Sequence, residues 1–176
     1  VYIRNMSEDQ LMIELLPFME RPEAEGGLPD SVERPLDRDY FKRLLPLVHE
    51  RLKLLTEGTD TLDFFFADNV NPAAEDLPGR KMDAEMTERA LEAALGLSRT
   101  VSPFEPEHLE AEYRALAEKI EMKPGQLFSP IRVATTGKSF APPLFDTMAA
   151  IGQERCVERI ENALRILRSA AVASGE

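Results

Sequence analysis

Apolar residues recur at intervals of three and four positions through most of this chain, and that spacing constrains its fold more than any other feature. It places apolar side chains on one face of an α-helix. No stretch alternates with period two for long enough to form a strand. The chain is therefore predicted to be all-α. The predicted helices cover residues 7–20, 37–58, 83–97, 105–120, 123–135, 142–151 and 153–171, with a short helical segment over 59–68.

The stretch 69–81 is polar, contains proline and lacks a helical period, so it is the best candidate for a linker. A chain of 176 residues is long enough for one ordinary domain or two small ones. We therefore predict two helical subdomains, over residues 7–70 and 71–172. The last residues, 173–176, are predicted to be a disordered end.

The composition excludes several classes of protein. One cysteine, Cys156, cannot form an internal disulfide, and with two scattered histidines it does not make a zinc ligand set. No apolar run approaches the roughly 18 residues that span a bilayer, and the start does not resemble a signal peptide. We expect a cytoplasmic chain with no membrane partner. Because it begins with Val1 and not Met, we interpret it as a fragment.

The net charge of −11 argues against nucleic acid at first sight, because phosphate binding depends on Lys and Arg. The charge is unevenly distributed. Residues 120–170 hold seven basic and five acidic side chains, a net charge of +2, so the remainder carries −13. A local basic surface in the C-terminal third is compatible with weak, salt-dependent RNA binding.

No pattern in the sequence carries catalysis. Gly137-Lys138-Ser139 is similar to the end of a phosphate-binding loop, but Arg132 stands where the first glycine is required. Pairs of carboxylates lie in charged segments without a neighbouring histidine, and neither His49 nor His108 has a nucleophile near it in sequence. We predict no catalytic residue, no metal ligand and no cofactor in this chain.

Three motifs carry a resemblance to a known family. They are GQLFSPIRVATTG at 125–137, APPLF at 141–145 and IGQER at 151–155. In this order and spacing they resemble the C-terminal anticodon-binding region of bacterial glutamyl-tRNA synthetase, a class I aminoacyl-tRNA synthetase. Tyr2-Ile3-Arg4 matches the family's junction with the preceding stem-contact domain, so the resemblance assigns residues 1–6 to the tail of that domain.

The resemblance implies two helical anticodon-binding subdomains and a partner, the anticodon loop of glutamate tRNA. It also implies that the catalytic domain, which uses ATP and Mg, lies outside this chain. The fragment is then a recognition module of a tRNA ligase that does not ligate anything itself. We expect a monomer that binds no DNA.

The resemblance also implies site residues. In the family, one arginine in the second helix of the first subdomain recognises the last anticodon base, and the matching position is Arg51. A planar guanidinium suits bidentate contact with a base edge. An exposed arginine that pairs with a carboxylate such as Glu50 is the structural alternative. A synthetase with arginine at this position resembles those that discriminate glutamate tRNA from glutamine tRNA.

In the second subdomain, Arg132 matches the family's anticodon-contacting arginine. Lys138 is a candidate phosphate contact, and a solvated lysine is an equally good interpretation. The remaining contacts are assigned to Ala141, Pro142 and Leu144 at the start of the next helix. Ala141 and Pro143 stand where relatives have a hydroxyl and a glycine, so backbone contacts are expected there instead of side-chain hydrogen bonds. Leu144 and Phe145 favour a core position over base stacking.

One alternative function stays open. A helical protein-interaction module would use the same apolar faces to dock a partner and would never bind RNA, and the acidic net charge favours it. The two functions differ in salt dependence, because RNA binding weakens with salt and apolar docking does not.

Overall fold

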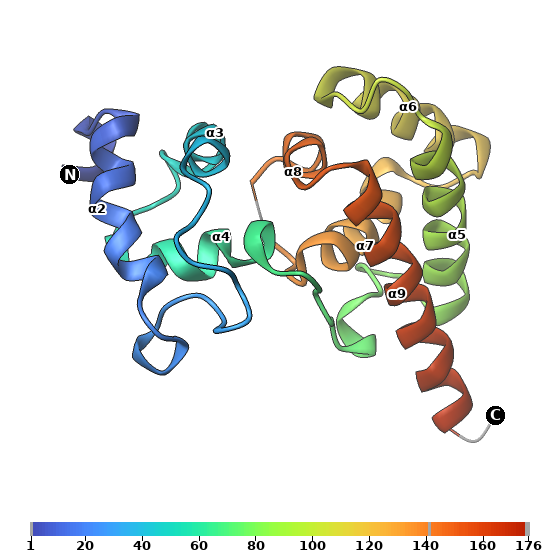
Figure 1. Cartoon of the computed structure of the whole chain (residues 1–176). Coiled ribbons are helices and arrows are strands. Elements are labelled where there is room, and N and C mark those ends of the chain that lie inside the picture. The colour runs from blue at the N-terminus through green and yellow to red at the C-terminus, as the bar shows by residue number, and fades with distance from the viewer. Residues whose placement is uncertain (1, 141, 175–176) are drawn as a thin grey trace. The chain divides into compact units, whose positions relative to one another are not determined.

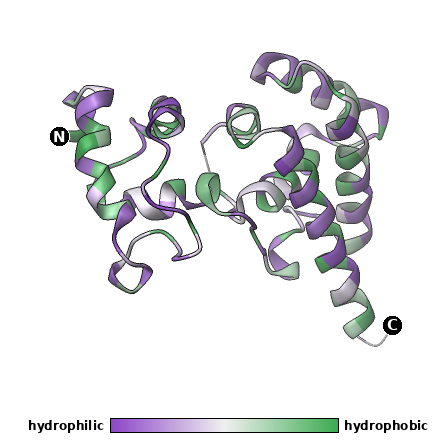
Figure 2. Ribbon diagram, in the orientation of Figure 1, coloured by the Kyte–Doolittle hydropathy of each residue, from purple (hydrophilic) through white to green (hydrophobic). Residues whose placement is uncertain are grey.

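A computed structural model of the chain describes residues 2–140 and 142–174, and every regular element in these ranges is helical. The all-α prediction is confirmed. The chain divides into two compact units, Val1–Asp68 and Asn69–Glu176 (Figure 1). The helices of both units contain hydrophobic as well as hydrophilic residues, as amphipathic helices do (Figure 2).

The first unit is built around α2, which packs against α3 and α4. Ser7 caps α2: its Oγ accepts a hydrogen bond of 3.2 Å from the backbone N–H of Gln10. The three helices bury apolar side chains at helical spacing, among them Leu15, Leu44 and Phe65. The helices of this unit are α1 (Tyr2–Asn5), α2 (Glu8–Glu20), α3 (Arg38–Val48) and α4 (Gly58–Phe66), with short 3-10 turns η1 (Glu23–Glu25) and η2 (Leu55–Glu57).

The prediction of one helix over 37–58 is wrong, because α3 ends at Val48. The carboxylate of Glu57 accepts hydrogen bonds from the backbone N–H groups of Lys53 and Leu54, at 3.0 and 3.1 Å. A continuous helix would use those N–H groups within its own backbone ladder. The chain therefore turns after α3. Leu52 in this turn is still buried, whereas Leu55 is only half-buried.

Arg34 holds the long connection between α2 and α3. Its guanidinium, which presents five N–H donors, donates to five backbone carbonyls. These carbonyls lie at the end of α2 and in the irregular connection that follows it, and the Pro29 carbonyl also accepts a hydrogen bond of 2.9 Å from the backbone N–H of Val32. One side chain thus replaces the hydrogen bonds that regular structure would otherwise supply. The acceptors are the carbonyls of Glu20, Arg21, Leu28, Pro29 and Val32.

In the second unit, α5 and α9 lie side by side (Figure 1). Helix α7 packs against both, and α6 packs against α7 and α8. On α5, small residues recur at helical spacing on the buried face, which lets α9 approach closely. The helices of this unit are α5 (Ala84–Thr100), α6 (Pro106–Lys119), α7 (Pro124–Thr136), α8 (Leu144–Ile151) and α9 (Gln153–Ala173), with one 3-10 turn, η3 (Ala74–Asp76).

Two buried polar side chains mark the core of the second unit. The Tyr113 hydroxyl lies beside Ser98 Oγ and 3.2 Å from the carbonyl oxygen of Ala94, and burial raises its pKa. Burial also raises the pKa of the Cys156 thiol to about 12. Because the thiolate is the reactive form, Cys156 is a core residue and not a nucleophile.

The stretch 69–81, predicted as a linker, packs against the second unit instead. Asn162 on α9 donates through Nδ2 to the Val70 carbonyl at 3.2 Å and to Asn71 Oδ1 at 3.1 Å. Pro72 and Leu77 are buried. Proline and polar residues here mark a segment without periodic structure, but not a free one.

The two ends of the chain bear on other predictions. Helix α9 continues to Ala173, two residues past the predicted end and into the stretch predicted as disordered, of which residues 175 and 176 lie outside the described residues. At the start, the segment 1–6 assigned to a preceding domain contributes Ile3 to the buried residues of the first unit. None of the described helices is long and apolar enough to cross a membrane.

Candidate functional site

The loop between α7 and α8 gathers most of the predicted site residues. Arg132 lies on the last turns of α7, and its Nη1 donates to the carbonyl oxygen of Pro142 at 2.9 Å. The same oxygen accepts a hydrogen bond of 3.2 Å from Thr147 Oγ1 on α8. Arg132 is half-buried, so the guanidinium is fixed beside the loop and still reaches its surface. The loop is thus tied to both flanking helices.

The first turn of this loop is held by Thr136. Its Oγ1 donates to the Arg132 carbonyl at 2.6 Å and accepts from the backbone N–H of Lys138 at 3.1 Å. Gly137 between them has φ of +74°, a left-handed conformation that favours glycine, and its N–H donates to the Val133 carbonyl. The threonine and glycine of the motif therefore end α7 and place Lys138, whose side chain is half-buried, at the start of the loop.

The end of the loop is mostly core. Pro142 and Leu144 are buried, while Pro143 is exposed. Phe145 packs in an edge arrangement against Phe128, with ring centroids 5.0 Å apart. Helix α8 begins at Leu144, two residues later than predicted, because the two prolines precede it. The predicted contact at Ala141 lies outside the described residues.

Phe140 is a site candidate that the sequence prediction missed. It is 79% exposed, on the same loop as Lys138 and Pro142. Single exposed apolar residues are common on protein surfaces, but an aromatic ring beside Lys138 is also a surface on which a nucleic-acid base can stack. The sequence feature that could have indicated Phe140 is an aromatic residue outside the helical period, directly after Lys138 and Ser139.

Arg51 lies in the first unit, apart in sequence from the α7–α8 loop. It belongs to the turn after α3 and not to a helix, which corrects the prediction. Its backbone N–H donates to the Val48 carbonyl at 2.9 Å. The side chain is exposed, and within the described residues it has no hydrogen bond or ion pair, including one to Glu50. The guanidinium is thus available to a ligand.

The two histidines do not form a catalytic site. His49 Nε2 lies 2.6 Å from the Ile3 carbonyl oxygen, so this nitrogen donates and holds α1 against the end of α3. No group of three potential metal-ligating side chains is found among the residues that the structure describes.

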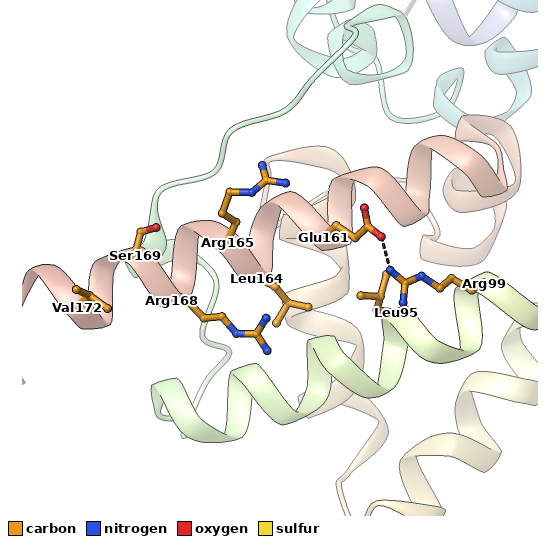
Figure 3. Close-up of a pocket in the computed structure, with 8 residues that line it drawn as sticks. All are labelled: Leu95, Arg99, Glu161, Leu164, Arg165, Arg168, Ser169 and Val172. Carbon is orange, nitrogen blue, oxygen red and sulfur yellow. Dashed lines mark hydrogen bonds and ion pairs between the residues drawn. The ribbon is translucent and has the colours of Figure 1, made fainter.

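A hollow of about 670 Å³ lies between α5 and α9 (Figure 3). Leu95 and Leu164 are among its lining residues. Two of its three arginines form ion pairs, whereas Arg165 donates to the amide oxygen of Asn162 at 3.0 Å. Arg99 forms an ion pair with Glu161, drawn as a dashed line in the figure. Arg168 forms ion pairs with Glu88 and Glu92 of α5. None of the described site residues that the sequence predicted lines this groove.

With this geometry in view, the chain can be compared with known proteins. Residues 10–164 match the model of the anticodon binding domain family. The chain is 44% identical over 170 residues to a glutamate–tRNA ligase of Roseiflexus castenholzii and 43% identical over 176 residues to one of Chloroflexus aurantiacus. These alignments cover 97% of this chain but 33% and 34% of the relatives, so it spans about a third of their length.

Solved structures with a similar fold include the following one. It is described as a glutamate tRNA ligase from Elizabethkingia meningosepticum in complex with its amino acid. The TM-score is 0.70 at 22% sequence identity, and the match covers 94% of this chain and 30% of that one. This similarity extends over both units and supports the fold.

Proposed function

The chain belongs to the family of anticodon-binding domains, and from that premise we propose that it recognises the anticodon of glutamate tRNA for a longer glutamate–tRNA ligase. The observation that carries the proposal is the family match across 10–164, which includes both the turn that holds Arg51 and the α7–α8 loop. The chain supplies binding and orientation. Attachment of glutamate, with ATP and Mg, belongs to the part of the ligase outside this chain.

The anticodon bases are recognised by two separate contact regions. In the first unit, Arg51 contacts the last anticodon base, since an exposed planar guanidinium can donate two parallel hydrogen bonds to a base edge. In the second unit, the α7–α8 loop holds the other bases through Arg132, Lys138 and the backbone around Pro142. Ala141 belongs to this region, and Leu144 supports it from the core.

Preorganisation supports the role of the α7–α8 loop. The hydrogen bonds of Arg132 and Thr147 to the Pro142 carbonyl hold the Pro142 end of the loop against α7 and α8. A fixed guanidinium and backbone lose less conformational entropy on binding than mobile ones do. We propose that the chain acts as a monomer in the cytoplasm, with one tRNA bound across both contact regions.

The direct test is binding of the purified chain to two RNA hairpins, measured by fluorescence anisotropy. One carries the anticodon stem-loop of glutamate tRNA, and the other has the same stem with the anticodon replaced. We expect tighter binding to the first, with log Kd rising by about 0.7 per tenfold increase in salt for each phosphate contact. Equal binding of the two hairpins, or none, would contradict the proposal. Salt-insensitive capture of an apolar peptide would favour a protein-docking module.

Phe140 gives a second prediction. If its ring stacks on an anticodon base, replacing it with alanine should weaken binding of the glutamate hairpin about fivefold, near 1 kcal/mol. Because the side chain is largely exposed, the thermal unfolding midpoint should not fall. Phe140→Tyr keeps a stacking surface and should bind like the unmodified chain. Val172→Ala, a change at another exposed apolar residue, is the matched control. Unchanged binding of Phe140→Ala would remove Phe140 from the site.

A further inference from the structure

A second hollow lies in the first unit, between α1 and the turn after α3. It has a volume of about 400 Å³ and is lined by Ile3, Arg4, Asn5, Leu52 and Lys53. We refer to it as the α1 pocket. Neither the family match, which begins at residue 10, nor the residues predicted from the sequence assign a function to it.

The walls of the α1 pocket are held in place by hydrogen bonds. The bond from His49 Nε2 to the Ile3 carbonyl joins α1 to the end of α3. The backbone N–H of Lys53 is bound by the Glu57 carboxylate at 3.0 Å. Ile3 and Leu52 are 5% and 2% exposed and form the apolar base. These contacts connect the two segments that form the walls of the pocket.

Its charge contrasts with the rest of the unit. Residues 1–68 hold eight basic and fifteen acidic side chains, a net charge of −7. Yet Arg4 and Lys53 are exposed at the pocket, and within the described residues neither side chain forms a hydrogen bond or an ion pair. Elsewhere in the unit Lys42 pairs with Asp9. Two backbone hydrogen bonds, and then the charge of Lys53, lower the pKa of the nearby Glu57 carboxylate. Two exposed cations on one small hollow favour an anion as its ligand.

We propose that the α1 pocket binds a backbone phosphate of the RNA whose anticodon Arg51 contacts. Arg51 lies in the same turn, two residues before Lys53, so one RNA strand can reach both. Arg4 and Lys53 supply charge, and the amide of Asn5 supplies an N–H donor, which are the groups that bind phosphate oxygens. This inference rests on the proposed function and adds a contact that positions the strand without recognising its sequence.

The test uses Lys53→Gln and Arg4→Gln with the two hairpins described above. Arg38→Gln is the matched control, because Arg38 is an exposed cation of the same unit that does not line the pocket. Each pocket variant should weaken binding roughly threefold to tenfold and make the slope of log binding constant against log salt less steep by about 0.7. A phosphate contact is independent of sequence, so the factor should be the same for any hairpin that binds measurably.

The outcomes separate this inference from the proposed function. If the unmodified chain does not prefer the glutamate hairpin, the proposed function fails, and the phosphate site with it. If the chain does prefer that hairpin but both pocket variants behave like Arg38→Gln, only the phosphate site is overturned. A loss confined to the pocket variants, with the smaller salt slope, supports it. Circular dichroism melts check that the variants remain folded.

Discussion

Replacing Arg34 with methionine is expected to lower the free energy of unfolding of the first unit by about 3–5 kcal/mol. Methionine keeps much of the aliphatic stem but removes all five N–H donors. Five backbone carbonyls of the connection between α2 and α3 then lose a charged partner. A buried carbonyl without a partner costs about 1–3 kcal/mol, and water can reach some of these groups, so the full sum is not reached.

The effect of Arg34→Met should be confined to one unit. Hydrogen exchange followed by mass spectrometry should show faster exchange in peptides from residues 20–48, with peptides from α5 and α9 unchanged. Arg34→Lys keeps the charge, but its single ammonium nitrogen cannot donate to all five carbonyls. It should therefore recover only part of the stability. Arg38→Met, a change at an exposed arginine, is the control. Equal stability of Arg34→Met and Arg38→Met would show that the five hydrogen bonds contribute little.

The parts of the fold that sequence could predict are those that local rules determine. The start of α2 follows from Ser7, whose side chain caps the helix whatever surrounds it. The end of α7 follows from Gly137, which takes the left-handed conformation. In both cases the signal lies within one helical turn of the residue that responds to it.

The errors arise where a side chain binds backbone groups outside a regular helical ladder, whether from three or four positions away, as Glu57 does, or from much farther along the chain. Glu57 binds the backbone of Lys53 and Leu54 and stops a helix that the apolar spacing alone would continue. Asn162 holds the stretch around Val70, which looks like a linker in sequence, from 92 positions away. Arg34 has no sequence signal at all, because its acceptors are backbone atoms.

The candidate site also has a part that could be predicted from the sequence and a part that could not. Arg51 and Arg132 were identified through the resemblance to a family, and physical reasoning alone would have left each as an ordinary surface arginine. The α1 pocket was not predicted, because it requires that Arg4 and Lys53, 49 positions apart, lie on one hollow. That juxtaposition depends on the His49 bond to Ile3, which is a tertiary contact.

Replacing Arg51 with glutamine is expected to weaken binding of the glutamate hairpin roughly tenfold to a hundredfold, about 1–3 kcal/mol, under the proposed function. The change removes a charge and the planar fork of donors. It should also reduce discrimination at the last anticodon base, so that hairpins from glutamate and glutamine tRNA bind more equally. A guanidinium distinguishes base edges by two parallel hydrogen bonds, which one amide reproduces only in part.

The structure makes this substitution easy to interpret. Arg51 is exposed and, within the described residues, makes no side-chain bond, so its replacement should leave the unfolding midpoint unchanged. A loss of affinity would then report a lost RNA contact and not a damaged fold. Arg51→Gln should also differ in kind from Lys53→Gln, because a phosphate contact weakens every hairpin by one factor whereas a base contact changes their ratio. If Arg51→Gln lowers the affinity for the glutamate and glutamine hairpins by the same factor, the ratio of their dissociation constants stays unchanged. In that case Arg51 contacts the RNA backbone, and the last anticodon base is recognised by another residue.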